Sequence, residues 1–183
     1  MRSCTLDGIK IDGICACVPS HTVDNTTFGA ELFGDRIEDT IRVTGIRTRR
    51  VCPPGSGITA LDLCIEAAKK LLEHHTLISS DLGGVLFVTQ TPDHDMPNNS
   101  SRAAHLLGLS KDCSAVDTNF GCSGYVYGLW LAGLMARSLA APVLLLDGET
   151  QSRCTSPRDR STALIFGDAG SATLVLPDEG AAP

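Results

Sequence analysis

The chain has 183 residues, of which 43% are hydrophobic and 20% are charged. This composition is typical of a globular protein and excludes a chain that is mainly disordered. Its net charge of −6 argues against a nucleic-acid-binding surface, because such a surface needs clustered Lys and Arg. No apolar run approaches the ~20 residues that span a bilayer, and the opening "MRSCTLDGIK" lacks the apolar core of a signal peptide. We therefore expect a cytoplasmic protein with neither nucleic-acid nor membrane partners.

The cysteines and histidines are not spaced like metal ligands. No CxxC motif occurs and the five histidines are scattered, so we predict neither a metal site nor a disulfide framework. Most of the eight cysteines are expected to be small buried hydrophobes, namely Cys4, Cys15, Cys17, Cys52, Cys64, Cys113 and Cys154. The one basic cluster, Arg47, Arg49 and Arg50, is expected to lie in a solvated loop.

In the first part of the chain, the apolar pattern predicts one strand and two helices. Residues 9–18 are rich in β-branched and small apolar residues, which favours a strand. A short helix over 35–43 is closed by Gly45, and the Pro and Gly residues of 51–57 indicate a loop. Thr59 is expected to cap a longer helix with one apolar face. That face consists of Leu61, Cys64, Ile65, Ala68, Leu71 and Leu72.

The rest of the chain alternates continuous apolar strands with helices. Strands are expected over 83–91, 113–119 and 141–149, and helices over 100–109 and 122–138. Residues 161–177 are interpreted as two strands joined by a hairpin turn at 167–170. This alternation predicts an α/β fold with a largely parallel sheet.

Cys122 lies where the predicted strand 113–119 runs into the next helix. Ligands in open α/β sheets bind beyond the carboxyl ends of strands, and a helix N-terminus favours the thiolate over the thiol. The small neighbours Gly121, Ser123 and Gly124 permit a sharp bend and the close approach of a substrate. These features suit a nucleophile for acyl transfer whose own N–H contributes to an oxyanion hole. On these local features alone, a buried packing cysteine is an equal alternative.

Three blocks of the sequence resemble β-ketoacyl-acyl-carrier-protein synthase III, a family of the thiolase superfamily. They are "TGIRTRR" (44–50), "DTNFGCSGY" (117–125) and "SPRDRSTALIFGDAGSATLVL" (156–176), in the family's order and at nearly its spacing. The last block is the most specific, because DRxT followed by FGDxxxA rarely arises by chance. The resemblance covers essentially all 183 residues. It implies one half of a thiolase-like fold, with a mixed, mainly parallel five-stranded sheet and helices on both faces.

The resemblance also implies roles for particular residues. Cys122 would take an acyl group from a thioester and pass it to a carbanion derived from a malonyl-thioester, with no cofactor or metal beyond the thioester substrate. Phe166 would lie at the acyl pocket. Met96 would lie at the tip of a loop that, in the family's homodimer, reaches into the partner's active site. The implied partners are an acyl carrier protein, an acyl-coenzyme A or other thioester, and a second copy of the chain.

Two positions at the expected coenzyme A site depart from the family. Arg160 matches an arginine that flanks the adenine, although a structural ion pair with Asp159 or Asp168 is an equal alternative. The family's tryptophan on the other adenine face falls at Asp39, and an arginine near the phosphates falls at Val43. Neither replacement supplies an aromatic face or a cation. The hypothesis is that the acyl donor is a carrier-protein thioester or an unusual acyl group of secondary metabolism.

The family's catalytic His and Asn lie in the second half of its fold, and no histidine here occurs in a matching motif. We interpret residues 1–183 as the N-terminal half-domain, with the C-terminal half elsewhere and the final "LPDEGAAP" resembling a linker. The predicted function is an acyltransferase of fatty acid or polyketide biosynthesis. The alternative is a non-catalytic partner subunit or an inactive fragment, and the retained Cys122 favours the enzyme.

Overall fold

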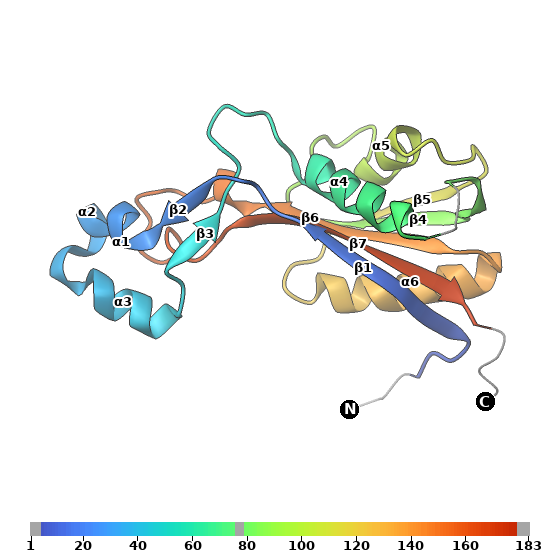
Figure 1. Ribbon diagram of the computed structural model, residues 1–183, viewed down its shortest axis with the longest axis horizontal. Coiled ribbons are helices and arrows are strands. Elements are labelled where there is room, and N and C mark those ends of the chain that lie inside the picture. Colours follow the sequence, from blue (N-terminus) through green and yellow to red (C-terminus); the bar gives the residue numbers. More distant parts are fainter. Residues whose placement is uncertain (1–4, 76–78, 179–183) are drawn as a thin grey trace.

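The molecule is built on a five-stranded mixed sheet with strand order β1-β7-β6-β4-β5 (Figure 1). The computed structural model describes residues 5–75 and 79–178, so Cys4 and the last residues of the linker-like end lie outside it. The strands are β1 (Ile9–Cys17), β4 (Gly84–Val88), β5 (Ser114–Thr118), β6 (Val143–Thr150) and β7 (Asp168–Pro177). β4 runs parallel to β5 and β6, whereas β7 runs antiparallel to β6 and β1. The α/β fold is confirmed, with as many antiparallel as parallel ladders.

Helices cover both faces of this sheet, as expected (Figure 1). α4 (Ala60–Glu73) and α5 (Asn99–Leu106) share one face, and α6 (Gly124–Leu139) lies on the other. Val85 and Phe87 of β4 pack toward α4, whereas Leu86 and Val88 pack toward α6. Alternate side chains of a strand point to opposite faces, and here both faces are covered, which explains why β4 is apolar throughout. None of the described helices is long and apolar enough to cross a membrane.

The start of α4 follows the cap predicted at Thr59. The Thr59 hydroxyl accepts the N–H of Asp62, and the Asp62 carboxylate accepts the N–H of Thr59 at 2.9 Å. This reciprocal pair is a capping box, which satisfies two of the backbone donors left free at a helix start. Five of the six residues of the predicted apolar face are buried, and Leu72 is half-buried.

A smaller unit projects from one end of the sheet (Figure 1). It contains the antiparallel pair β2 (Thr22–Asp24) and β3 (Thr48–Arg50), and the helices α1 (Asn25–Phe28), α2 (Ala30–Phe33) and α3 (Ile37–Thr44). Gly45 ends α3 in the left-handed conformation at φ 73°, as its position predicted. Three 3-10 turns complete the secondary structure of the described residues: η1 (Gly34–Arg36), η2 (Ser79–Asp81) and η3 (Gln151–Arg153).

The hairpin predicted over 161–177 is wrong. Only β7 is a strand in this stretch, and it pairs with β6 and β1 instead of with residues 161–166. The preceding residues form helical turns, in which Ala163 N–H donates to Asp159 at 2.9 Å and Ile165 N–H donates to Thr162 at 3.0 Å. Asp168 is the first residue of β7 and is buried. Its carboxylate accepts the backbone N–H groups of Cys52 and Ser152, and these bonds allow its burial.

The expectation that the basic cluster is solvated holds for Arg47 and Arg50, which are exposed, and is wrong for Arg49. Residues 48–50 form β3, and Arg49 is only 9% exposed. Arg49 donates to the side-chain oxygen of Asn25 at 2.8 Å and to the carbonyl of Phe166 at 2.8 Å, and its guanidinium lies over the Phe28 ring. Asn25 is fully buried and donates to the carbonyls of Ile46 and Leu164. A buried arginine needs such partners, and they join the projecting unit to the loop before β7.

Candidate active site

Cys122 stands at the corner of a tight turn between β5 and α6. The Gly124 N–H donates to the Gly121 carbonyl over 2.7 Å, which closes a four-residue turn with Cys122 and Ser123 at its centre. Ser123 has φ −91° and ψ 3°, the dihedrals of the third residue of a type I turn, and its carbonyl accepts the N–H of Tyr127. The Cys122 side chain is exposed, which does not fit the alternative of a buried packing cysteine.

Small residues allow α6 to begin directly over the end of β4. A Cβ on Gly124 would lie 2.8 Å from Val88 Cγ1, and one on Gly128 would lie 2.8 Å from Val88 Cγ2. Ala132 and Ala136 continue this buried stripe at four-residue spacing. Larger side chains at these positions would push the helix off the sheet. The close packing therefore holds the turn beside the carboxyl ends of β4 and β5.

Glu149, near the end of β6, holds the segment that follows β4. Its Oε1 accepts the N–H of Gln90 at 2.6 Å, and its Oε2 accepts the hydroxyl of Thr91 at 2.7 Å. The Gln90 side chain lies against Gly121, where a Cβ would come within 3.2 Å of Gln90 Nε2. Glu149 therefore positions the loop that borders the Cys122 turn.

A second carboxyl group, Asp147, lies close to the start of α6. Asp147 pairs with Val88 in the parallel β4–β6 ladder, and paired residues point to the same face of a sheet. Its side chain is therefore on the face that α6 covers, beside the valine that Gly124 approaches. Burial, and then the charge of Glu149, raises the pKa of Asp147 to about 6. This carboxyl group changes its charge close to neutral pH.

Five of the six other described cysteines, Cys15 among them, are buried or half-buried, whereas Cys122 is exposed. Burial raises the pKa of the thiols of Cys17, Cys113 and Cys64, and burial together with Asp168 raises that of Cys52 to about 11. A thiol held in the protonated form is a poor nucleophile. Cys154 is exposed, so the prediction of a buried cysteine there is wrong; it lies in the irregular loop after η3, where no element covers it.

Met96 lies in the loop between β4 and α5, where its side chain is 83% exposed. The two ends of this loop are held by carboxylates. Asp93 accepts a bond from Arg102 at 2.8 Å, and Asp117 of β5 accepts the N–H groups of Asn99 and Ser100 at the start of α5. These contacts fix the base of the loop and leave Met96 projecting at its surface.

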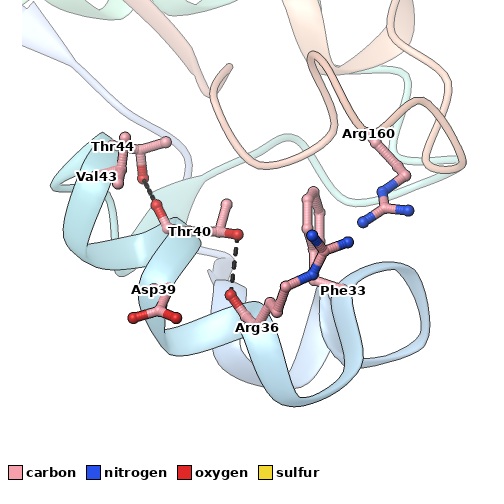
Figure 2. A pocket seen from close by; sticks show the side chains of 7 residues that line it. All are labelled: Phe33, Arg36, Asp39, Thr40, Val43, Thr44 and Arg160. Carbon is pink, nitrogen blue, oxygen red and sulfur yellow. Dashed lines mark hydrogen bonds between the residues drawn. The ribbon is translucent and has the colours of Figure 1, made fainter.

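The structure brings Arg160 together with both positions that depart from the family. Arg160, Asp39 and Val43 line one pocket of ≈ 290 Å³, formed by α3, the turn before it and the loop before β7 (Figure 2). The remaining lining residues are Phe33, Arg36, Thr40 and Thr44. The guanidinium carbon of Arg160 lies 5.0 Å from the centroid of the Phe33 ring. Asp39 and Val43 therefore lie at the same pocket as Arg160.

The alternative ion pair of Arg160 is not formed within the described residues. The Asp159 carboxylate accepts bonds from Ser161 and Thr162, and the Asp168 carboxylate accepts bonds from Cys52 and Ser152. Stacking on Phe33 takes the place of an ion pair. Within residues 5–75 and 79–178, no hydrogen bond, ion pair or ring contact joins Cys122 to Met96, Phe166 or Arg160.

Sequence reasoning missed Phe33 and Arg36 as lining residues of this pocket. Arg36 directly precedes α3, so Arg36, Asp39, Thr40 and Val43 recur at three- and four-residue intervals on one side of the helix. That spacing was visible in the sequence once Asp39 and Val43 had been assigned to the site. Phe33 lacked such a signal, because the turn between α2 and α3 was not predicted.

The fold and the turn at Cys122 define one half of a thiolase-like fold with an exposed cysteine at the mouth of a helix. A model of the 3-oxoacyl-[acyl-carrier-protein] synthase III family matches residues 116–182. A β-ketoacyl-[acyl-carrier-protein] synthase III from Nitratidesulfovibrio vulgaris is 42% identical over 136 residues, covering 74% of this chain and 40% of the relative. A second, from Bacillus subtilis, is 36% identical over 176 residues, covering 93% of this chain and 51% of the relative.

The solved structures agree with the sequence comparison. A 3-oxoacyl-(acyl-carrier protein) synthase from Burkholderia xenovorans superposes with a TM-score of 0.91 at 36% identity, over 97% of this chain and 50% of that one. The resemblance stated from the sequence is confirmed: the chain is similar to β-ketoacyl-acyl-carrier-protein synthase III along nearly all its length. It spans about half the length of the relatives that it matches.

Proposed function

We propose that this chain carries the nucleophile of an acyltransferase of the synthase III type, and that Cys122 is that nucleophile. The observation that carries the proposal is the exposed Cys122 at the centre of the Gly121–Gly124 turn, directly before a 16-residue helix. A helix N-terminus stabilises a thiolate, and the exposed side chain lets a thioester reach the sulfur.

The reaction follows from the chemistry of a thiolate. Cys122 Sγ attacks the carbonyl carbon of an acyl thioester, and the carbonyl oxygen becomes an oxyanion that the Cys122 N–H helps to stabilise. The carbon–sulfur bond of the donor then breaks, and the leaving thiolate takes up a proton. In the second stage a malonyl-thioester loses carbon dioxide, and its carbanion attacks the acyl-cysteine to form a β-ketoacyl product and release Cys122. Alternatively, the second stage transfers the acyl group from Cys122 to another acceptor. Condensations of this kind belong to fatty acid or polyketide biosynthesis, which is the proposed role of the complete protein.

Three further residues have proposed roles at the substrate path. Phe166 is 38% exposed and would face the acyl chain, and its carbonyl is held by the buried Arg49. Met96 would enter the site of a second copy, which agrees with its exposed position on a loop with a fixed base. Arg160 would hold the polar end of the thioester donor in the pocket that it lines (Figure 2).

We also propose that these residues form the N-terminal half-domain and that a second half supplies the catalytic His and Asn. The outer side of α6 supports this, because Val126, Trp130 and Leu134 recur there at four-residue spacing and are 38–69% exposed. An exposed apolar stripe on a central helix is expected to be covered by another element. The chain also covers only about half of its relatives.

A homodimer is part of the same proposal. β5 is an edge strand of the sheet, and its Val116 side chain is 43% exposed. An unprotected edge strand favours pairing with a second copy across a two-fold axis.

The seven described cysteines are all free, which agrees with a reducing, cytoplasmic location.

The test is product formation by the complete protein, as expressed from its own gene, with an acyl thioester and a malonyl-thioester. Cys122→Ala should lower the rate by at least about 10³-fold, whereas Cys154→Ala, which removes the other exposed thiol of the loops, should leave it unchanged. Equal loss in both variants, or no loss in either, would favour the alternative of a non-catalytic partner subunit or inactive fragment.

A further inference from the structure

A second pocket, of ≈ 360 Å³, lies between the β2–β3 pair and the segment that runs from η3 to the start of β7. In the pair, Val23 is opposite Arg49, so both side chains point to the same side and line this pocket. The segment after β6 contributes Ser152, Thr155 and Ala163. None of the lining residues is shared with the pocket in Figure 2, and none belongs to the Gly121–Gly124 turn.

Arg49 gives this pocket a buried cation with a free hydrogen-bond donor. Its Nε donates to Asn25 and its Nη1 donates to the carbonyl of Phe166, and neither partner lines the pocket. Its Nη2 is buried and has no hydrogen-bond partner within residues 5–75 and 79–178. A buried donor without a partner costs free energy, and the cost is larger for a charged group. Nη2 is therefore available to an acceptor that enters the pocket.

The charge of Arg49 is only partly compensated by the described residues. Burial lowers the pKa of the Arg49 guanidinium, and the charge of Asp168 opposes this lowering without cancelling it. The Asp168 carboxylate accepts bonds from Cys52 and Ser152, and within the described ranges it forms no ion pair with Arg49. The described lining of the pocket contains no Asp or Glu. An anion fits such a site better than a cation does.

Phe28 lies between the Arg49 guanidinium and the pocket. Its ring is 5.0 Å from the guanidinium carbon, and it also lines the pocket. The Phe28 side chain is 38% exposed and belongs to the four-residue helix α1. Exposed side chains change rotamer within nanoseconds, so the ring can turn aside. This movement uncovers the buried Nη2 on the pocket side.

We propose that this pocket binds a small monocarboxylate with an apolar body, whose carboxylate accepts hydrogen bonds from Arg49 Nη2 once the Phe28 ring has turned aside. A volume of ≈ 360 Å³ is near the lower end of the roughly 300–1,000 Å³ of ligand pockets, which favours a small ligand. The site is separate from the Cys122 turn and does not depend on the proposed acyltransferase function. The apolar part of the lining consists of Val23, Phe28, Val51, Pro54, Pro157 and Ala163.

The experiment measures binding of three probes of one shape and different charge to the complete protein by calorimetry: benzoate, benzamide and benzamidine. A hydrogen bond from a guanidinium to a carboxylate is stronger than one to a neutral amide. Benzoate should therefore bind at least about tenfold more tightly than benzamide. The cationic benzamidine should give no measurable binding, because it would face the positive charge of Arg49.

Variants then locate the bound probe. Val23→Phe fills the pocket without removing a bond of Arg49, and should lower benzoate affinity at least about tenfold. Its matched control is Thr22→Phe, which adds the same ring at the next, exposed residue of β2, outside the lining. This control should change affinity by less than about twofold. Phe28→Leu removes the ring that covers Arg49, and should raise benzoate affinity.

Arg49→Met should abolish the preference for benzoate over benzamide in protein that thermal denaturation shows to be folded. If this variant does not fold, Val23→Phe and Thr22→Phe still decide the question, because both retain Arg49. Equal affinity for benzoate and benzamide, tighter binding of benzamidine, or no detectable binding of benzoate would overturn the inference. Wild-type benzoate affinity in Val23→Phe would also overturn it, since the probe would then bind elsewhere.

Discussion

The backbone N–H of Gly124 donates to the carbonyl of Gly121 over 2.7 Å, and this bond sets Cys122 at the corner of the turn before α6. The same Gly124 lets the helix approach β4, since a Cβ there would lie 2.8 Å from Val88 Cγ1. One residue therefore closes the turn and sets the distance between helix and sheet. The position of the thiol depends on both.

Gly124→Ala should lower the free energy of unfolding by about 1–3 kcal/mol, because the new methyl group overpacks against Val88. Chemical denaturation of the variant and the wild type measures this loss. The double variant Gly124→Ala/Val88→Ala supplies the missing space and should show a favourable coupling between the two sites. Strictly additive losses in the double variant would mean that this contact does not limit the packing of α6.

Thiol labelling should distinguish Cys122 from Cys154, the other exposed cysteine. With limiting iodoacetamide near neutral pH, we expect Cys122 to react about tenfold faster, because only Cys122 precedes a long helix. Cys52 and Cys64 should react slowly, since burial keeps both thiols protonated. Peptide mapping at several times gives the four rates. Faster modification of Cys154 than of Cys122 would contradict activation by the turn.

Asp147→Asn should stabilise the protein at alkaline pH. Because burial raises the pKa of Asp147 to about 6 in the fold, its protonated form is favoured there. The contribution of protonated Asp147 to the free energy of unfolding is fully present below its unfolded pKa of about 3.8, and it is lost as the pH rises through about 6. The neutral asparagine avoids the loss, so the gain should be about 1 kcal/mol near pH 8, discounted for partial exposure, and smaller near pH 5.

Denaturation of Asp147→Asn and wild type at both pH values measures this difference. The control Asp112→Asn removes an exposed carboxylate in the turn before β5 and should change stability by less than about 0.5 kcal/mol at either pH. A gain for Asp147→Asn that is equal at both pH values would show that its titration is not the cause.

Thr59→Ala should cost about 1 kcal/mol of unfolding free energy, because it removes the hydroxyl that accepts the Asp62 N–H at the start of α4. Thr59→Ser retains this acceptor and should lie within about 0.3 kcal/mol of the wild type. Thermal denaturation followed by circular dichroism gives both values. Equal losses for alanine and serine would mean that the methyl group, and not the capping box, stabilises the helix start.

Local signals predicted the elements that depend on local chemistry. Thr59 with Asp62 marked the start of α4, and the continuous apolar run of β4 marked a strand covered on both faces. The hairpin failed because Gly167 and Asp168 resemble a turn in sequence, whereas the Asp168 carboxylate is recruited by backbone groups of Cys52 and Ser152. These partners are 116 and 16 residues away, and no local pattern records them.

At the candidate site, too, features set by neighbouring residues were predictable and features set by distant residues were not. The bend at Cys122 was visible because small residues flank it on both sides. The burial of Arg49 was not, since it depends on Asn25 and on the carbonyl of Phe166, 117 residues away. The same run of basic residues can be fully exposed in one fold and contribute a buried arginine in another. Long-range packing determines which of the two occurs.

Residues 1–183 produced alone should self-acylate slowly and form no measurable β-ketoacyl product. Decarboxylation of a malonyl-thioester needs hydrogen-bond donors at the developing enolate oxygen, which we assign to the His and Asn of the second half. Loss of one such donor typically costs about 10²–10³ in rate. Addition of the matching second half should restore product, and a normal turnover rate by the chain alone would refute the half-domain proposal.

The most direct test of the central claim is the site of acylation. The complete protein is incubated with an acyl thioester, and intact mass and peptide mapping locate the acyl group. The account predicts one acyl group per chain, attached to Cys122 and lost on treatment with hydroxylamine, with none in a folded Cys122→Ala variant. An acyl group on Cys154 or on another residue, or unmodified Cys122 in folded protein after long incubation with several thioesters, would contradict it.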